Sequence, residues 1–388
     1  MIERIMNRKA LELSEKFQVI AITGPRQSGK TTLARTAFPG KHYCSLEDPG
    51  IRRVALEDPK GFLGAHPEGM ILDEAQRVPE LFSYIQTIVD QTGKSGQFIL
   101  TGSQNFLLHE SISQTLAGRV AILKLLPFSL EETKGTEFDI HKLDELLYTG
   151  LYPGMHDRKI PAGDWFPNYI QTYVERDLRS IQNVFDLNLF QKFLRLCSGR
   201  VGQLVNFSSL ASDCGISHNT AKSWLGLLEQ SYLIFFARPY HNNFNKRLIK
   251  MPKLFFYDTG LLCALLGIEN SAQLETHYLR GSIFESLVVC ELLKYRWNRG
   301  IGNGLYFFRD KSGREIDCIV EIGGKPIAIE VKSGKTIVPD HLDSIKYWEK
   351  ISGLNGRSFL IYGGEEKLKL RNTSILGWHD LTDIFTSC

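Results

Sequence analysis

The chain has 388 residues, a length sufficient for two or three domains. Apolar residues make up 43% and charged residues 23% of the chain, a balance typical of a soluble globular protein with ample core material. The formal net charge of +3 excludes a polycation, so any surface that binds nucleic acid has to be local.

Two further classes are disfavoured by composition. The longest apolar runs fall well short of the ~20 residues that cross a bilayer, and acids and bases interrupt the first residues, so we expect neither a membrane span nor a secretory signal. The seven cysteines are scattered and form no C-x-x-C pair, which disfavours a disulfide framework or a zinc site. We expect a reduced protein in the cytoplasm without membrane contact.

Residues 3–16 are predicted to form an amphipathic helix leading into an apolar strand at Val19–Ile22. The strand is followed by G-x-x-x-x-G-K-T and then by a helical pattern, the context that a nucleotide-binding P-loop requires and a chance glycine turn lacks. The two glycines let backbone N–H groups face phosphate oxygens, Lys30 neutralises the outer phosphates, and the Thr31 hydroxyl can bind Mg²⁺. The predicted ATP-binding residues of this loop are Gly24, Pro25, Arg26, Gln27, Ser28, Gly29, Lys30, Thr31 and Thr32.

The stretch Met70–Ala75, MILDEA, has the Walker B pattern, an apolar run that ends in two acids. A buried strand there would deliver Asp73 and Glu74 at its carboxyl end, beside the phosphate loop. Asp73 is predicted to hold Mg²⁺, directly or through water, and Glu74 to orient and deprotonate the attacking water. A strand that ends in acids by chance is the alternative, which the P-loop upstream makes less favourable.

Two more positions are candidates for the ATPase reaction. The strand Phe98–Gln104, FILTGSQ, ends in polar residues, and either Ser103 or Gln104 would sense the γ-phosphate or the lytic water; an ordinary turn fits almost as well. Arg119 precedes the strand Val120–Leu126 and is a candidate arginine finger, in cis or, in a homo-oligomer, in trans. A plain surface arginine is an equally good interpretation.

Together these motifs resemble one family. The stretches GPRQSGKTTL, ILDEAQRVPELF, ILTGSQNFLL and LAGRVAILKLLPFSLEE are similar to the prokaryotic AAA-type ATPases that carry a C-terminal domain of uncharacterised function, and the resemblance covers essentially the whole chain. It implies an α/β ATP-binding domain whose Walker B strand lies apart from the P-loop strand. It indicates the chemistry of the protein rather than its biological role.

Residues 131–200 are predicted to form a helical connector, broken at Gly150, Pro153 and Gly154. Its second half carries the charged pair Arg176 and Asp177 within an apolar helical pattern. Similar proteins have a like Tyr-x-x-Arg-Asp stretch, which would allow Arg176 to contact nucleotide or a neighbouring subunit. We interpret the pair as a solvated outer face of the helix.

Residues 201–258 have helix-turn-helix spacing, with helices at Asn206–Cys214 and from a Ser217 cap to about Gln230. Two extended runs follow, and the stretch RPYHNNFNKRLIKMPK between them interleaves basic residues with Tyr240 and Phe244. A basic hairpin suits a wing that contacts phosphates. We therefore predict a winged-helix domain that binds DNA, with a winged helix used for protein contacts as the alternative. The basic residues of the wing are Arg238, Lys246, Arg247, Lys250 and Lys253.

Residues 259–388 combine a helix acid with an acidic hairpin. Glu285 borders the apolar stripe of the helix Arg280–Leu293, where a carboxylate is costly unless it is paired or binds metal. Two strands joined at Gly323-Gly324 follow, and their alternation brings the remaining polar groups to one face. These groups are Asp317, Glu330 and Lys332.

This arrangement resembles the PD-(D/E)xK restriction-endonuclease-like superfamily, with Ile316 at the position of the usual proline. The resemblance implies that Asp317 and Glu330 bind Mg²⁺, that Lys332 positions water or stabilises the pentavalent phosphate, and that Glu285 is an additional acid near the metal. A hairpin with surface acids, or an inactivated domain that only binds, is the alternative.

We thus predict an α/β protein with a P-loop NTPase core at residues 1–130, the helical connector at 131–200, a winged-helix domain at 201–258 and a nuclease-like domain at 259–388. ATP hydrolysis would move the DNA-engaging domains and gate Mg²⁺-dependent cleavage of phosphodiesters. The alternatives are an ATP-switched DNA-binding regulator without nuclease activity, a protein-remodelling ATPase and a nucleotide-binding scaffold with negligible turnover. The sequence does not specify which DNA structure or sequence would be bound or cut, and it does not identify a protein partner.

Overall fold

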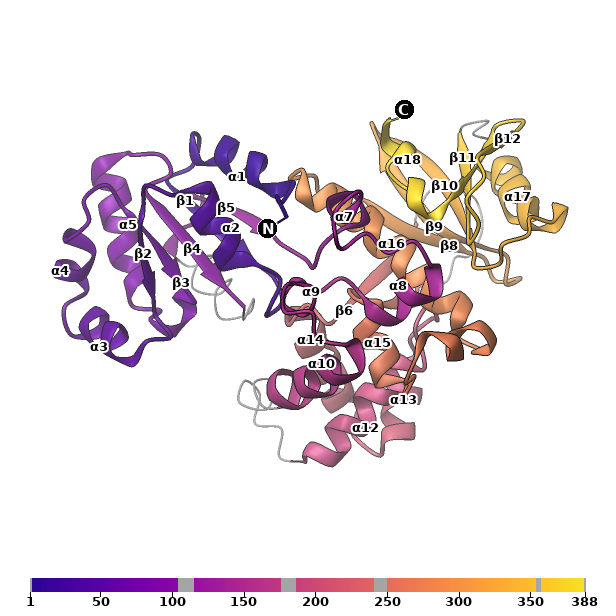
Figure 1. Ribbon diagram of the computed structural model, residues 1–388, viewed down its shortest axis with the longest axis horizontal. Helices are drawn as coiled ribbons and strands as arrows, with labels where there is room; N and C mark the ends of the chain where they lie inside the picture. Colours follow the sequence, from indigo (N-terminus) through magenta and orange to yellow (C-terminus); the bar gives the residue numbers. More distant parts are fainter. Residues whose placement is uncertain (1, 104–114, 176–185, 241–249, 354–356, 387–388) are drawn as a thin grey trace.

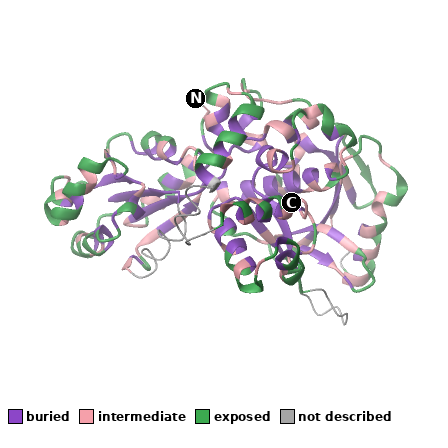
Figure 2. Ribbon diagram, turned by 90° about the horizontal axis from the view of Figure 1, so that it is seen from below, coloured by how far each residue is buried: buried purple, intermediate pink, exposed green. Residues whose placement is uncertain are grey.

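The computed structural model describes residues 2–103, 115–175, 186–240, 250–353 and 357–386, which form two lobes side by side (Figure 1). The N-terminal lobe holds one sheet, and the second lobe holds a layer of helices and a second sheet. Buried residues concentrate in the two sheets and in the helices between them (Figure 2). Within the described ranges, no helix combines the length and the apolar character that a membrane span needs.

The N-terminal sheet is parallel throughout, with strand order β2-β3-β4-β1-β5. Alternate residues of β1 face opposite ways, so Val19 packs with α5 on one face and Ile20 with α1 and α2 on the other. β4 lies between β1 and β3, which confirms the predicted separation of the P-loop and Walker B strands. The strands are β1 (Val19–Thr23), β2 (His42–Ser45), β3 (Met70–Asp73), β4 (Phe98–Gly102) and β5 (Val120–Lys124). The helices are α1 (Met6–Ser14), α2 (Lys30–Ala37), α3 (Pro49–Glu57), α4 (Pro59–Gly64), η1 (Ala75–Arg77) and α5 (Leu81–Thr92).

A helical layer follows the first sheet. Gly150 ends α8 with a φ of 65°, and the aromatic side chains of Tyr152, Trp165 and Tyr169 stack against one another with ring centroids 4.7–5.1 Å apart. Asn206 and Ser217 cap α13 and α14, so the two helices begin where the sequence predicted. The helices are α7 (Leu130–Thr133), α8 (Leu143–Thr149), α9 (Pro153–Asp157), α10 (Ala162–Tyr169), η2 (Ile170–Glu175), α12 (Leu187–Ser198), α13 (Phe207–Cys214), α14 (His218–Gln230), α15 (Thr259–Leu265) and η3 (Ser271–Thr276).

The second sheet has eight strands in the order β12-β13-β11-β10-β9-β8-β6-β7. Gly323 and Gly324 have positive φ and join β9 to β10, so the predicted hairpin is confirmed. Its strands are β6 (Ile234–Pro239), β7 (Lys253–Phe256), β8 (Leu305–Arg309), β9 (Glu315–Ile322), β10 (Lys325–Lys332), β11 (Ser358–Tyr362), β12 (Leu368–Leu370) and β13 (Thr373–Gly377). The helices beside it are α16 (Arg280–Asn298), η4 (Pro339–Leu342), α17 (Asp343–Ser352), η5 (Trp378–Asp380) and α18 (Asp383–Thr386).

The hairpin β6–β7 belongs to this second sheet. Arg238 and Pro239 of β6 pair in parallel with Tyr306 and Phe307 of β8. One hydrophobic cluster, from Leu126 to Ile384, runs through the whole second lobe. The segments predicted as connector, winged helix and nuclease-like domain therefore pack around a common core.

Arg4 joins the start of the chain to both lobes. Its guanidinium donates to Glu132 Oε1 at 2.9 Å, to the Ser28 carbonyl of the phosphate loop at 2.7 Å and to the Leu126 carbonyl at 2.7 Å. The Glu132 side chain is fully buried and also completes a capping box with Ser129 at the start of α7. One buried ion pair thus holds together the N-terminus, the phosphate loop and the junction between the lobes.

Replacing Arg4 by Met should destabilise the protein by about 3–5 kcal/mol, because Glu132 is then left buried without a cation. We expect a lower urea midpoint, followed by circular dichroism. The control is Lys16→Met, just after α1, which removes an exposed pair with Glu12 and should leave the midpoint nearly unchanged. Equal shifts for the two variants would contradict a structural role for the buried pair.

Candidate functional site

The phosphate loop lies between β1 and α2, and its two glycines have backbone conformations that favour glycine. The φ angles are 151° at Gly24 and 90° at Gly29. A Cβ added to Gly24 would lie 2.0 Å from the carbonyl oxygen of Leu125, which follows the adjacent strand β5. The loop is therefore pressed against its neighbour, and α2 begins directly at Lys30.

Lys30 lies inside the loop, with only 6% of its surface exposed. Its Nζ donates to the Pro25 carbonyl oxygen at 2.8 Å. Burial lowers the pKa of the Lys30 ammonium, while Glu74 and Asp73 act in the opposite direction. The loop thus places the Lys30 amine where the outer phosphates of a nucleotide would lie.

Asp73, at the end of β3, accepts hydrogen bonds from three hydroxyl groups. Thr31 Oγ1 donates to both of its carboxylate oxygens, at 3.0 and 3.1 Å, and Tyr43 donates to Oδ2 at 2.8 Å. Thr101 of β4 donates to Oδ1. A carboxylate and a hydroxyl that meet beside a phosphate loop are hard oxygen donors of the kind that Mg²⁺ prefers, so the residues fit a magnesium site.

Glu74 follows Asp73 in a left-handed conformation with a φ of 53°. Its Oε2 accepts hydrogen bonds from Ser103 Oγ at 2.8 Å and from Gln76 Nε2 at 2.5 Å. Burial opposes ionisation, but Lys30 and these hydrogen bonds outweigh it and lower the pKa of Glu74. The carboxylate is thus ionised and held in one orientation. Ser103 contacts Glu74, whereas Gln104 lies outside the described residues.

The second lobe contributes to the nucleotide cleft, which has a volume of about 350 Å³. Helix α9 lines one side of it, and a Cβ added to Gly154 would lie 2.5 Å from Gln27 Oε1 of the phosphate loop. The sequence analysis missed Asp157 and Arg158 because no local pattern links them to a loop so distant in the chain. The residues that line the cleft are Arg26, Gln27, Gly29, Lys30, Thr31, Thr32, Glu47, Asp73, Glu74, Pro153, Gly154, Asp157 and Arg158.

Arg119 lies at the amino-terminal ends of the strands, whereas the phosphate loop of the same chain lies at their carboxyl-terminal ends. Its carbonyl accepts from Val19 N at the amino end of β1, whereas the loop follows the carboxyl end of β1. Its guanidinium pairs with Asp90 at 2.5 and 2.9 Å. This position is incompatible with an arginine finger in cis, and a role in trans stays a prediction. Arg176 lies outside the described residues.

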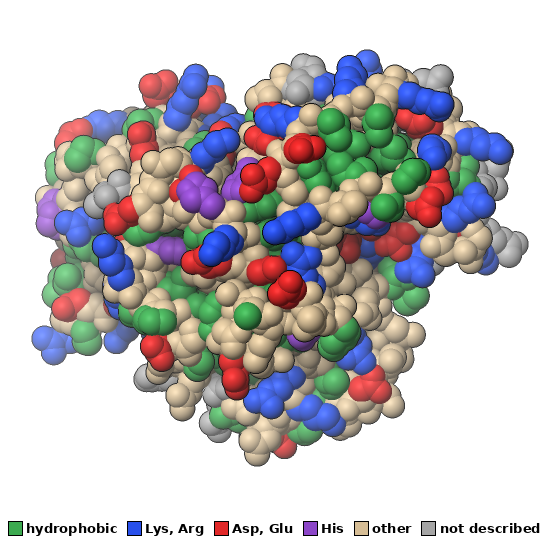
Figure 3. Space-filling model, turned by 45° about the vertical axis from the view of Figure 1, so that its right-hand side comes forward, with side chains coloured by type: hydrophobic (Ala, Val, Ile, Leu, Met, Phe, Trp, Pro, Cys, Tyr) green, Lys and Arg blue, Asp and Glu red, His purple; other side chains and the backbone are tan. Residues whose placement is uncertain are grey.

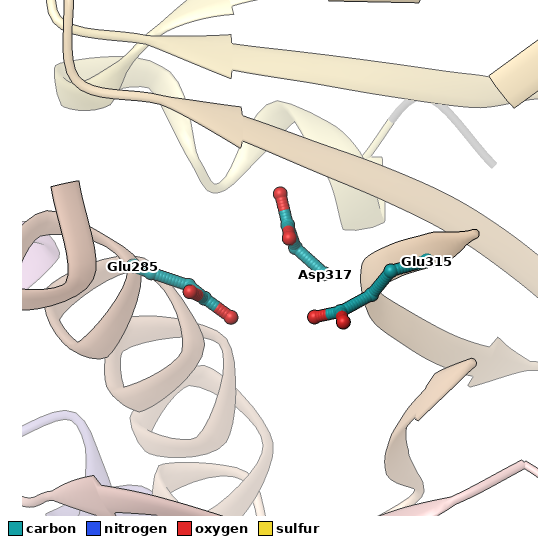
Figure 4. Close-up of side chains that lie close together, drawn as sticks. All are labelled: Glu285, Glu315 and Asp317. Carbon is teal, nitrogen blue, oxygen red and sulfur yellow. The ribbon is translucent and has the colours of Figure 1, made fainter. Parts of the chain in front are cut away.

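A second acidic site lies between α16 and β9. Oxygen atoms of Glu285, Glu315 and Asp317 lie within 4.8 Å of one another, and the carboxylates of Glu285 and Glu315 point toward each other (Figure 4). The analysis of the sequence missed Glu315, although it stands two positions before Asp317 and so shares a strand face with it. The side chains converge here because α16 packs across the sheet.

Glu330 and Lys332 adjoin this cluster from β10. Lys332 Nζ lies 2.6 Å from Glu330 Oε1 and 4.0 Å from Asp317 Oδ2. Burial raises the pKa of Glu330 to about 8, with Asp317 adding to the shift and Lys332 opposing it. Burial likewise raises the pKa of Glu285 to about 8, against the attraction of Lys253. Because side chains alternate along a strand, Asp317, Glu330 and Lys332 lie on the same face of the sheet, as predicted.

The prediction that Lys253 belongs to a phosphate-contacting wing is wrong. Its side chain is only 2% exposed, and its Nζ lies 2.8 Å from Glu285 Oε1, in contact with Glu315 Oε1 and 3.9 Å from Asp317 Oδ1. Tyr240 is also buried, against Trp348, and so is not available for stacking on a base. Lys246, Arg247 and Phe244 lie outside the described residues.

The remaining polar residues of the helix-turn-helix are at the surface. His218, Asn219 and Lys222 are exposed at the start of α14, and Arg238 and Lys250 are exposed near the hairpin β6–β7. On the face drawn in Figure 3, Lys and Arg side chains are interspersed with Asp and Glu. Any contact with nucleic acid therefore depends on local groups, as the net charge predicts.

Comparison with known families divides the chain into three parts. Residues 16–134 match the AAA domain, residues 140–272 match a domain of unknown function (DUF8612), and residues 280–381 match another domain of unknown function (DUF4143). The uncharacterized protein Rv2008c of Mycobacterium tuberculosis is 30% identical over 372 residues, 95% of this chain and 81% of that protein. An uncharacterized protein of Haemophilus influenzae is 23% identical over 354 residues, 84% of each chain.

Solved structures resemble the chain less closely. The Walker-type ATPase PABY2304 of Pyrococcus abyssi has a TM-score of 0.42 at 16% identity, covering 67% of this chain and 94% of that one. AMPPCP-bound DnaA from Aquifex aeolicus has a TM-score of 0.31 at 17% identity, covering 58% and 86%. Both scores are low.

Replacing Gly24 by Ala should weaken ATP binding at least about tenfold, because the new Cβ would collide with the Leu125 carbonyl and displace the loop. Fluorescence titration with a labelled ATP analogue measures this. Gly40→Ala is the control, since an added Cβ there has no heavy atom within 4 Å. Unchanged affinity in a folded Gly24→Ala protein would show that the loop geometry is not required.

Proposed function

This chain belongs to the family of the uncharacterized protein Rv2008c and carries an AAA-type P-loop ATPase domain, and from this premise we propose that it hydrolyses ATP to act on DNA. The proposed site comprises Lys30, Thr31, Asp73 and Glu74. The observation that carries the proposal is the meeting of Asp73 with Thr31 beside Lys30, at the carboxyl end of β3.

Each of these residues has a defined chemical task in the proposal. The loop N–H groups and Lys30 bind the phosphates, and Glu74 orients the attacking water and accepts its proton. Thr31 and Asp73 would hold Mg²⁺, which neutralises charge on the phosphates when bound. Ser103 and Gln76 position Glu74 through its Oε2.

The proposed coupling between nucleotide and second lobe runs through α9. Gly154 touches the phosphate loop, and Leu151, two residues before α9, donates its N–H to Asp258 Oδ2 at 2.8 Å. Asp258 follows β7 and caps α15 through Leu261 N at 2.9 Å. These contacts support a mechanism in which the state of the nucleotide is passed to the strand that carries Lys253.

Replacing Glu74 by Gln should lower steady-state ATP hydrolysis at least about 100-fold while ATP binding persists, because the amide cannot accept a proton. Phosphate release and fluorescence titration give the two readouts. Glu80→Gln, an exposed acid six residues on, is the control. Full turnover in Glu74→Gln would contradict the assigned role, and a wild-type protein without turnover would favour the scaffold alternative.

We infer DNA as the partner from the helices α13 and α14, whose spacing suits helix-turn-helix binding. The exposed His218, Asn219 and Lys222 at the start of α14 support this inference. A protein partner for the same helices is the alternative, and binding that weakens steeply with added salt distinguishes DNA from it.

A second candidate function is metal-dependent cleavage of phosphodiesters by the C-terminal sheet. The convergence of Glu285, Glu315 and Asp317 favours it, because three carboxylates within 4.8 Å supply hard oxygen donors. Lys332, 4.0 Å from Asp317, is the proposed group for positioning water or stabilising the phosphate. Glu330 lies on the same face and is a further proposed ligand.

If this candidate function is correct, wild-type protein should nick supercoiled DNA in the presence of ATP and Mn²⁺, and Lys332→Ala should lose at least about 90% of that activity because the phosphate charge is no longer offset. Conversion to open circles on an agarose gel is the readout. Lys335→Ala, an exposed lysine three residues on, should cut normally. Absence of cutting on linear, nicked and branched substrates would favour the regulator without nuclease activity.

A further inference from the structure

Lys253 lies at the centre of the carboxylate cluster. Its Nζ approaches one oxygen each of Glu285, Glu315 and Asp317, and the side chain is 2% exposed. The other oxygens of two of these acids have different partners. Arg309 lies 3.0 Å from Glu315 Oε2, and Val331 N donates to Asp317 Oδ2 at 2.9 Å. Glu285 Oε1, Glu315 Oε1 and Asp317 Oδ1 thus all face a single ammonium group.

This position is the one that a metal ion would need. One oxygen atom from each of these three carboxylates lies within 4.8 Å of the other two, a spacing that suits ligands of a single cation. A divalent ion and the Lys253 ammonium cannot both lie among the same three carboxylates. The two cations would repel each other, and the site has no room for both. Occupation by Lys253 and occupation by metal are therefore mutually exclusive.

Lys253 is held in place from its own strand. It opens β7, pairs with Ala237 of β6 and forms a bridge with Leu204. Its ammonium also lies 5.6 Å from the centroid of the Phe307 ring on β8. Because β6 and β8 are neighbours in the sheet, the lysine lies on the same sheet as Glu315 and Asp317.

Glu330 provides an independent observation. It is 4% exposed, and its Oε2 accepts no hydrogen bond within the part of the chain that the structure describes. Its Oε1 lies 2.6 Å from Lys332 Nζ, and Asp317 and Glu285 are among the charges that act on it. A buried carboxylate oxygen without a partner is costly, which indicates that this face can accept one more cation.

We propose that Lys253 is the resident cation of this cluster, and that a divalent cation binds Glu285, Glu315 and Asp317 only when Lys253 withdraws. The conformation described here is the closed one. The path from α9 through Leu151 and Asp258 to β7 gives nucleotide a means to act on Lys253. The proposal takes its ligand class, a divalent cation, from the second candidate function above.

Binding of Mn²⁺ to the full chain, measured by the loss of the free-ion signal in electron paramagnetic resonance, tests the proposal. Lys253→Met should bind one more Mn²⁺ than wild type, or bind it at least about tenfold more tightly. Lys250→Met removes the same charge from an exposed side chain three residues away and should behave like wild type. Equal Mn²⁺ binding by Lys253→Met and wild type would overturn the proposal.

Two further readouts keep the proposal testable if Lys253→Met is unstable. Mn²⁺ should raise the melting temperature of Lys253→Met by several degrees more than that of wild type, because metal replaces the missing charge. In wild type, acetic anhydride should leave Lys253 unmodified without metal and modify it at saturating Mn²⁺, as followed by mass spectrometry. Lys253 that is reactive without metal, or protected at saturating Mn²⁺, would overturn the proposal.

These outcomes separate the proposal from the nuclease hypothesis. If Lys253→Met gains Mn²⁺ but neither protein ever cuts DNA, the lysine is the resident cation and the nuclease hypothesis fails. If wild type cuts DNA and binds Mn²⁺ as tightly as Lys253→Met, the nuclease hypothesis stands and the proposed role of Lys253 fails.

Discussion

Buried charge in need of a partner is the constraint on which this structure depends. A charged group removed from water is costly unless an opposite charge or several hydrogen-bonding groups surround it. At the junction of the lobes, Arg4 meets Glu132, and Lys294 Nζ lies 2.7 Å from both Glu291 Oε1 and the Phe128 carbonyl. Because Arg4 and Glu132, and likewise Lys294 and Phe128, are distant in the chain, satisfying these charges also fixes how the lobes are joined.

The same constraint gives the two acidic sites different states. Asp73 and Glu74 receive hydroxyl and amide hydrogen bonds next to Lys30, so their charges are held beside a phosphate loop and are available to a nucleotide. In the C-terminal site the compensating charge is Lys253, which lies within the cluster itself. One site therefore faces a cleft, whereas the other is neutralised from inside the protein.

The nucleotide cleft and the acidic cluster are linked by short steps through the second lobe. Helix α9 lines the cleft, and Leu151, two residues before α9, donates to Asp258, two residues after β7. β7 is an edge strand of the C-terminal sheet, and β6 and β8 connect it through backbone pairing to β9 and β10. Such a continuous packed unit transmits a displacement better than separately tethered domains would.

Local pattern by itself determined the phosphate loop, the acids at the end of β3, the capped helices α13 and α14 and the hairpin at Gly323, because each depends on spacing within a few residues. Only the tertiary structure decided which distant groups meet. It brought Arg158 to the cleft, placed Arg119 at the amino-terminal ends of the strands and turned Lys253 from a surface wing residue into a buried counter-ion. A lysine that binds phosphate and one that neutralises carboxylates look alike in sequence, since the difference lies in which charge the fold brings within reach.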